Sequence, residues 1–331
     1  MRSRVVAVAV AGLVLGLVPG VAEASGVRCE EVRIPVALGA GKPVDAEVTG
    51  TLCRPRGRDR GVLQVLIPGG GYDRNYWTWR GDPRGPSYVE AMNRAGYPTF
   101  ALDRIGTGQS SAPPSGSFAP DSQTFTIHQV LRALRSQYER IVLVGNSLGS
   151  TISRMIAVHH PEDADGLILT GESSTPNWPV FEQLGADYIT AAEHPLLVRR
   201  NLDSGYGVLR PGVRRGWFYY GPTAANSVVA RDEANPEPDV FPTDPEFGSV
   251  ALNRQIKVPV LVVVGSHDRL ICGTGASDCS SSAALLAGER PYYATDLAAL
   301  VVPNTGHVLN LHRTAPTFYP HLAHWTNQHL N

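Results

Sequence analysis

Short apolar runs alternate with amphipathic segments along most of this chain, and the alternation predicts its secondary structure. Apolar runs indicate buried strands, and segments with apolar positions at helical spacing lie between them. The predicted strands are 62–67, 98–102, 141–144, 166–170, 259–265 and 297–302. The predicted helices are 87–95, 122–137, 150–159 and 314–329. Strands that alternate with helices indicate an α/β fold built on a doubly wound, mostly parallel sheet.

The segment before the first of these strands has a different period. Apolar and polar residues alternate over 32–36 and again over 44–52, which predicts an N-terminal antiparallel hairpin at the edge of the sheet. A register centred near residue 41 places Cys29 opposite Cys53.

A third pattern begins at residue 172, where aromatic residues, prolines and short helical pieces occur without a clear strand up to about residue 255. We interpret 172–255 as a mainly helical cap inserted between two parts of the core, 25–171 and 256–331. Such a cap would cover the carboxyl ends of the strands, where ligands bind in open α/β sheets.

Residues 1–24 have the pattern of a secretory signal peptide. Two arginines precede an apolar run from Val5 to Val18, and cleavage is expected near Ala24. The sequence therefore predicts a secreted protein, extracellular or in the cell envelope, with no stable membrane association after cleavage. An uncleaved anchor is the alternative, although the apolar run is short for a membrane span.

Composition narrows the possible partners. Of the 331 residues 43% are hydrophobic, which suffices for a large core, and the net charge is −1. The sequence has no basic patch of the kind that would indicate nucleic-acid binding. The four cysteines can oxidise in an exported protein, and we predict the disulfides Cys29–Cys53 and Cys272–Cys279, with free buried thiols as the alternative. The two pairs are far apart in the chain, so no metal site is expected from them.

The pentapeptide Gly145-Asn146-Ser147-Leu148-Gly149 lies between a predicted buried strand and a predicted helix. A Gly-x-Ser-x-Gly segment in this context is typical of a nucleophile elbow, the tight turn that lifts a serine hydroxyl toward a base. Ser147 is therefore the candidate nucleophile. An ordinary glycine-rich strand-to-helix loop is the alternative.

A serine nucleophile needs a base, and the base needs an orienting acid. In this architecture the chain order is serine, acid, histidine, each at the carboxyl edge of the sheet. Asp268 follows the strand 259–265, and His307 follows the strand 297–302. Glu172 is the alternative acid, and His312 is the alternative base.

These motifs resemble those of the α/β-hydrolase superfamily, in particular its serine esterases and lipases, and the resemblance covers nearly the whole predicted mature chain. Residues 103–110 also match the family's Asp-x-x-Gly-x-Gly-x-Ser segment. The resemblance implies that Ser147 is the nucleophile, Asp268 the acid and His307 the base. It also implies that Asp103 holds its loop by capping backbone amides.

The resemblance extends to an oxyanion hole, which would combine the backbone N–H of Leu148 with one from the glycine loop 68–72. Pro68 stands where the family usually has histidine, so Gly70 and Gly71 both remain open as the second donor; we favour Gly70. Aromatic residues beside this loop and in the cap are the predicted substrate contacts. They are Tyr72, Tyr76, Trp77 and Trp178.

The sequence thus predicts an exported serine hydrolase that cleaves a carboxylic ester of an apolar or aromatic small molecule through an acyl-enzyme. No metal or organic cofactor is implied, and the oligomeric state stays open. A lactonase, a thioesterase or an aminopeptidase on the same triad is an alternative, the last because acidic cap residues could hold a free amine. A non-catalytic binding protein on a hydrolase fold is the alternative of another class, although such proteins usually lack a triad member.

Overall fold

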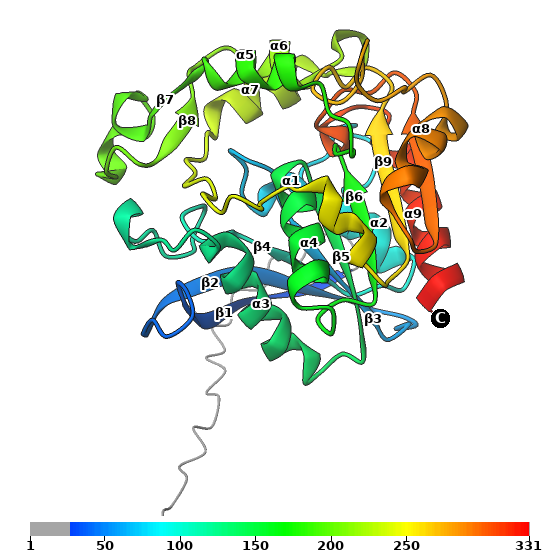
Figure 1. Ribbon diagram of the computed structural model, residues 1–331, viewed down its shortest axis with the longest axis horizontal. Coiled ribbons are helices and arrows are strands. Elements are labelled where there is room, and N and C mark those ends of the chain that lie inside the picture. Colours follow the sequence, from blue (N-terminus) through cyan, green and yellow to red (C-terminus); the bar gives the residue numbers. More distant parts are fainter. Residues whose placement is uncertain (1–26, 331) are drawn as a thin grey trace, which may run out of the picture.

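The structure is a computed structural model that describes residues 27–330, so the predicted signal peptide lies outside the described residues. A central eight-stranded sheet has the order β1-β2-β4-β3-β5-β6-β9-β10 (Figure 1). Its strands are β1 Val27–Ala37, β2 Val44–Pro55, β3 Val62–Ile67, β4 Thr99–Leu102, β5 Arg140–Asn146, β6 Gly166–Thr170, β9 Val260–Gly265 and β10 Leu297–Val302. From β4 to β10 neighbouring strands are parallel, whereas β1 and β2 form an antiparallel edge. The predicted fold class is confirmed.

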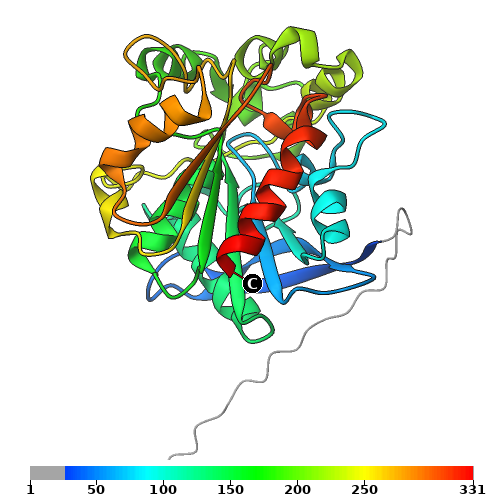
Figure 2. The same ribbon diagram turned by 90° about the vertical axis from the view of Figure 1, so that its right-hand side faces the viewer.

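Helices cover both faces of the sheet, and Figure 2 shows α9 lying across one of them. One face packs α3 (Ser122–Arg135), α4 (Leu148–His159) and α8 (Ser282–Glu289), and the other packs α1 (Asn75–Thr78), α2 (Tyr88–Arg94) and α9 (Ala315–Leu330). In β5, Ile141 and Leu143 pack in the apolar core on the α3 and α4 face of the sheet. Val142 and Val144 pack in the core on the α2 and α9 face. Because both faces are buried, the central strands appear in the sequence as continuous apolar runs.

Two helices have no clear signal in the sequence. The helix α1 has only four residues. The helix α8 carries alanine and glycine where an amphipathic helix would carry charged residues, so its apolar positions show no helical period.

The N-terminal hairpin has the predicted register over most of its length. Cys29 pairs with Cys53, and the same register continues to the pair Val36 and Ala46. A bulge after Val36 then shifts the pairing, so Ala37 lies opposite Val44.

The segment between β6 and β9 lies over the carboxyl ends of the parallel strands (Figure 1). It contains α5 (Trp178–Gly185), α6 (Arg214–Phe218) and α7 (Asn226–Ala234), with short 3-10 turns between them. It also contains a two-stranded antiparallel sheet of β7 (Tyr188–Thr190) and β8 (Gly207–Leu209), where the sequence shows no clear strand. Strands of three residues are too short to display the alternation that identifies a strand. We call the segment 172–255 the cap.

Within the described residues, no helix has both the length and the apolar character needed to cross a membrane.

Candidate active site

Ser147 occupies the sharp turn between β5 and α4. Its φ is 51° and its ψ is −119°, a backbone conformation that is strained for a residue with a side chain. The flanking glycines make the turn sterically possible. A Cβ atom on Gly145 would lie 2.3 Å from the Ser150 backbone nitrogen, and one on Gly149 would lie 2.1 Å from the Ile67 carbonyl oxygen. The glycine pattern of the elbow is therefore a requirement of close backbone packing.

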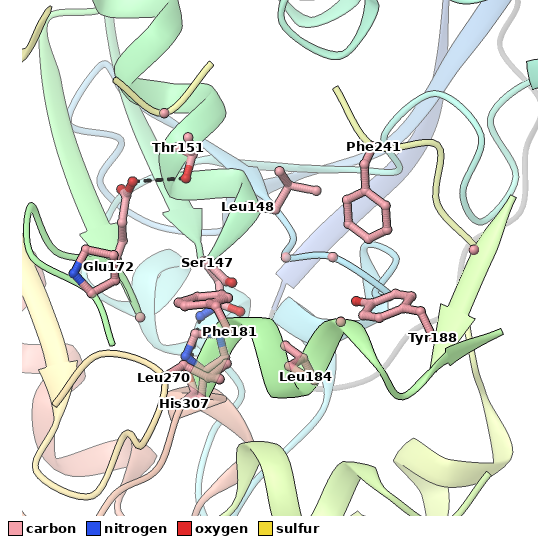
Figure 3. Close-up of a pocket in the computed structure, with 18 of the residues that line it drawn as sticks. Ser147, Leu148, Thr151, Glu172, Phe181, Leu184, Tyr188, Phe241, Leu270 and His307 are labelled. Carbon is pink, nitrogen blue, oxygen red and sulfur yellow. Dashed lines mark hydrogen bonds between the residues drawn. The ribbon is translucent and has the colours of Figure 1, made fainter. Parts of the chain in front are cut away.

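His307 is held by a buried carboxylate. Its Nδ1 lies 2.8 Å from Asp268 Oδ2, and the two residues are 3% and 0% exposed. The Leu270 N–H donates to the other carboxylate oxygen at 3.1 Å. When this carboxylate is ionised it can only accept hydrogen bonds, so a neutral imidazole beside it donates from Nδ1 and has its lone pair on Nε2. Ser147 and His307 line the same pocket (Figure 3).

The alternative acid and base are engaged elsewhere. The Glu172 carboxylate forms an ion pair with Arg154 at 2.7 Å. The Nδ1 of His312 lies 2.9 Å from the Val308 carbonyl oxygen, and its Nε2 accepts the Tyr220 N–H at 2.9 Å. Burial lowers the pKa of His312 to about 4, so this ring is neutral and serves as a bridge between backbone groups.

A pocket of about 1010 Å³ opens beside Ser147, between the sheet and the cap. In Figure 3, Thr151 and Glu172 lie on one side of Ser147, and Tyr188 and Phe241 lie on the other. Apolar side chains make up much of its wall: Phe181, Leu184, Phe218, Phe241, Phe247, Leu270 and Ile271. Several of these cap residues were not predicted. The spacing of Phe181 and Leu184, three apart on α5, is the signal that could have identified two of them.

The predicted aromatic contacts divide into two groups. Tyr72 and Trp178 line the pocket, and Trp178 is 63% exposed. Tyr76 and Trp77 do not line it. The Tyr76 and Trp77 rings pack edge to face at 5.0 Å, and Trp77 packs against Tyr88 of α2 at 5.1 Å. The assignment of Tyr76 and Trp77 to substrate contact is therefore corrected, because α1 buries both rings in the aromatic core beneath the pocket.

The two candidate oxyanion donors in the glycine loop differ in their partners. The Gly71 N–H donates to Asp239 Oδ2 at 2.6 Å, and Gly71 is not part of the pocket wall. Gly70 and Leu148 do line the pocket, and no protein atom in the described part of the chain accepts a hydrogen bond from either N–H. The structure therefore favours Gly70 over Gly71 as the second donor.

Asp103 has the capping contacts that the sequence motif implies. One of its carboxylate oxygens accepts the Arg74 N–H at 2.8 Å, and the other accepts the Gln109 N–H at 2.9 Å. Its side chain thereby joins the loop after β4 to the segment that follows the glycine loop.

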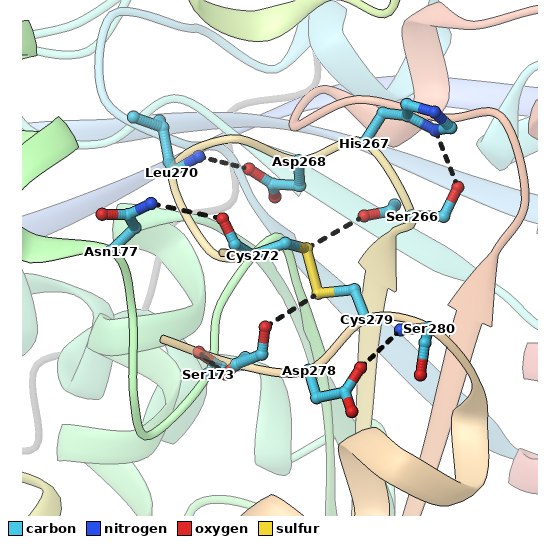
Figure 4. Close-up of a disulfide and its surroundings, with 12 residues drawn as sticks. Ser173, Asn177, Ser266, His267, Asp268, Leu270, Cys272, Asp278, Cys279 and Ser280 are labelled. Atoms are coloured by element: carbon cyan, nitrogen blue, oxygen red, sulfur yellow. Dashed lines mark hydrogen bonds between the residues drawn. A yellow bond between two sulfur atoms is a disulfide. The ribbon is translucent and has the colours of Figure 1, made fainter. Parts of the chain in front are cut away.

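A disulfide braces the segment that carries Asp268. Cys272 and Cys279 are bonded (Figure 4), and the Cys272 N–H donates to the Asp268 carbonyl at 2.8 Å. The Asn177 side chain, at the start of α5, donates to the Cys272 carbonyl at 3.2 Å. The disulfide loop therefore connects the segment of the acid to the first helix of the cap. The other two cysteines form the bond Cys29–Cys53 in the edge hairpin.

One group of described residues outside the pocket has donor types suited to a metal ion: His128, His160 and Asp163, with ligand atoms within 4.8 Å of one another. The His128 Nδ1 lies 2.6 Å from Asp163 Oδ2, and the two histidine rings stack at 3.7 Å. The group lies at the carboxyl end of the 12-residue helix α4, about 18 Å from the elbow at its other end. It therefore takes no part in the pocket.

Comparison with known proteins gives a family match and similarity to two proteins named as lipases. Residues 64–318 match the model of the alpha/beta hydrolase family. Lipase 1 of Psychrobacter immobilis is 28% identical over 55% of this chain and 57% of the lipase. Lipase 3 of Moraxella sp. (strain TA144) is 23% identical over 53% of this chain and 56% of that protein. The chain thus spans little more than half the length of these two relatives.

Among solved structures, a highly thermostable carboxyl esterase from Bacillus coagulans superposes with a TM-score of 0.62. It is 18% identical, and the superposition covers 92% of this chain and 99% of the esterase. At this identity the likeness shows the fold alone.

Proposed function

Because the chain belongs to the alpha/beta hydrolase family, we propose that it is an exported serine hydrolase that cleaves carboxylic esters of apolar or aromatic small molecules through an acyl-enzyme. One observation carries the proposal: a serine on a strained elbow shares a pocket with a histidine that is bound to a buried carboxylate. The two relatives named as lipases support an ester as the substrate.

The proposed reaction uses five residues of this chain. Ser147 Oγ attacks the ester carbonyl while His307 Nε2 takes its proton, and Asp268 stabilises the imidazolium that forms. The N–H groups of Gly70 and Leu148 receive the negative charge on the carbonyl oxygen. The tetrahedral intermediate expels the alcohol, which takes the proton from His307. Water then attacks the acyl-Ser147 while His307 takes a proton from it. The second tetrahedral intermediate expels Ser147 Oγ, which takes that proton from His307, and the carboxylic acid is released.

The walls of the pocket support an uncharged, apolar substrate. Burial of a methylene group contributes about 0.8 kcal/mol, so an apolar acyl or alcohol group gains affinity along this lining. The charged side chains in the described lining have partners of their own. Arg154 and Glu172 form an ion pair at 2.7 Å, and Glu193 accepts the Thr190 hydroxyl at 2.8 Å. The ion pair neutralises Arg154, so the described lining offers no free arginine or lysine to a substrate carboxylate, whereas the Glu193 carboxylate, bonded to Thr190, keeps its negative charge.

Export is supported by two features of different kinds. All four cysteines are in disulfides, which persist in oxidising compartments. The pattern of residues 1–24 is that of a secretory signal peptide.

The test is a substrate panel with the purified chain from Ser25 onward. We expect p-nitrophenyl esters to be hydrolysed, with kcat/KM rising from the acetate to longer acyl chains as the apolar pocket fills. Lactones, thioesters and aminoacyl p-nitroanilides are assayed beside them, and preferred cleavage of one of these would replace the ester assignment. Absence of hydrolysis, together with no fluorophosphonate labelling of Ser147, would instead support a non-catalytic binding protein.

A further inference from the structure

A buried ion pair lies directly behind the glycine loop. Arg104 comes from the segment after β4, and Asp239 comes from the cap, yet both side chains are 0% exposed. The Nη1–Oδ1 distance is 2.6 Å and the Nη2–Oδ2 distance is 2.7 Å. This two-bond geometry in a dry environment is both directional and strong. The function proposed above leaves the pair without a role.

The pair contacts the glycine loop at three backbone atoms. Arg104 Nε donates to the Pro68 carbonyl at 3.1 Å, and its Nη2 donates to the Gly69 carbonyl at 3.0 Å. Asp239 Oδ2 accepts the Gly71 N–H at 2.6 Å. The ion pair therefore holds the loop on both sides of Gly70.

These contacts determine where the Gly70 N–H points. The Gly69 carbonyl and the Gly70 N–H belong to one planar peptide group, and in a trans peptide they point in opposite directions. When Arg104 binds that carbonyl, it fixes the N–H on the opposite side. Asp239 fixes the next peptide plane through the Gly71 N–H. Three consecutive glycines would otherwise sample many orientations, whereas an oxyanion donor must be accurately placed before the reaction.

We propose that Arg104 and Asp239 are positioning residues for the oxyanion hole, and that they make the cap a part of the catalytic apparatus. This inference rests on the proposed function. Donation by Arg104 to the Gly69 carbonyl also polarises that peptide group, so the Gly70 N–H becomes a stronger donor.

A second ion pair provides a comparison within the same loop. Arg214 Nη2 donates to the Gly71 carbonyl at 2.7 Å, and Arg214 pairs with Asp232 of the cap at 3.1 Å. This pair holds the peptide group between Gly71 and Tyr72. That group is one peptide plane beyond the plane that Asp239 holds, and two planes beyond the plane that contains the Gly70 N–H. Loss of this pair should therefore affect catalysis less than loss of the Arg104–Asp239 pair.

The experiment uses the whole mature chain, p-nitrophenyl butyrate as substrate and phenylboronic acid as inhibitor. Arg104→Lys removes the two-bond geometry, and Asp239→Asn keeps the shape while removing the charge. We expect kcat to fall by about 10- to 1,000-fold in each variant, with KM changed by less than about 3-fold. The boronate adduct places an oxygen in the oxyanion hole, so its Ki should rise in proportion to the loss in kcat/KM.

Asp163→Asn is the matched control, because this carboxylate is also buried and paired but belongs to the remote group beyond the carboxyl end of α4. It should lower the Tm without lowering kcat. Cooperatively folded Arg104→Lys and Asp239→Asn proteins with unchanged kcat and Ki would overturn the inference. Wild-type hydrolysis and fluorophosphonate labelling are measured first, so that failure of the proposed function is recognised separately.

If neither variant folds, amide exchange of the wild-type protein decides the question. The Gly71 N–H should be protected at all times, whereas the Gly70 N–H should become protected only when phenylboronic acid binds. Rapid exchange of the Gly71 N–H, or no boronate effect at Gly70, would overturn the inference.

Discussion

Ser147, Asp268, His307 and Gly70 each follow the carboxyl end of a sheet strand, but the loop that carries Gly70 is in addition held by charged side chains from distant parts of the chain. On the core side of the pocket, the hydrogen bonds of the parallel sheet position the residues. On the cap side, two buried Arg–Asp pairs do so.

The two sides differ in how a substitution affects activity and stability. The core side is supported by many backbone hydrogen bonds, so a side chain can be exchanged there without moving the framework. The cap side depends on a few desolvated charges. Removal of one partner from such a pair costs about 3–5 kcal/mol, because the other charge stays buried without compensation. We therefore expect substitutions of the triad residues on the core side to affect chemistry alone, and variants on the cap side to affect chemistry and stability together.

The largest expected effect is on the core side. Ser147→Ala should lower kcat by at least ~10⁴-fold while the Tm stays close to that of the wild type, because the members of a triad act as a unit. Ser150→Ala, one turn along the same helix, is the control and should keep most of the activity. A fluorophosphonate should label Ser147 only. Labelling at another residue, or an active Ser147→Ala protein, would contradict the assignment.

The next effect distinguishes two candidates for the acid of the triad, which follow the neighbouring strands β9 and β6. Asp268→Asn should reduce kcat by about 10⁴-fold, because the imidazole is then left in the wrong tautomer. Glu172→Gln should have a mild effect on kcat, since this carboxylate pairs with Arg154. Steady-state kinetics of both variants test the ranking, and the opposite order would move the acid from β9 to β6.

Removal of each disulfide separates an effect on the Tm from an effect on kcat. They span 24 and 7 residues, and each contributes about 2–4 kcal/mol, less for the shorter loop. Replacing Cys272 and Cys279 by serine should lower kcat more than the Tm suggests, because the loop braces the Asp268 segment. Replacing Cys29 and Cys53 should lower the Tm with little change in kcat at 25 °C.

Mass spectrometry of unreduced peptides is the first measurement for the disulfide comparison. Free thiols, or a bond between the two pairs, would remove the basis of this division of roles. Equal effects of the two double variants on kcat would show that the brace is not needed for the acid.

The last effect concerns stability alone and reports on the proximity of the cap to the core. Burial, followed by repulsion from Glu237 of the cap and from Asp103, raises the pKa of Asp73 from 3.8 to about 7. Because the folded chain binds this proton more tightly than the unfolded chain, the contribution to stability is greatest below about pH 4. It declines as the pH rises to about 7 and then stays constant.

Asp73→Asn should therefore make the Tm less sensitive to pH between 4 and 8 and should raise it most at pH 8. Glu237→Gln removes one of the repelling charges, so it should flatten the pH dependence of the Tm by a smaller amount, while the loss of its ion pair with Arg200 lowers the Tm at every pH. Thermal melts across this range are the measurement. Parallel curves for wild type and Asp73→Asn would show that Asp73 titrates normally.

Much of the framework was determined by the sequence alone, because the signals are local. A strand buried on both faces is apolar throughout, and most of the helices packed on one face show their period, so the order of most elements follows from the pattern. The turn at Ser147 needs glycine on either side for steric reasons that involve adjacent residues. The pairing of Cys29 with Cys53 follows from the two-residue period of a hairpin.

Only the tertiary structure decided the cap side of the pocket. Tyr76 and Trp77 are adjacent to the glycine loop in sequence, yet the packing of α1 on α2 buries them beneath it. Arg104 and Asp239 are separated by 135 residues, and Asp239 is one of 30 acidic residues in the chain. No periodicity marks such a contact. Its partners are selected by burial, because a charge that loses its water is stable only beside its counter-charge, and burial is a property of the folded chain.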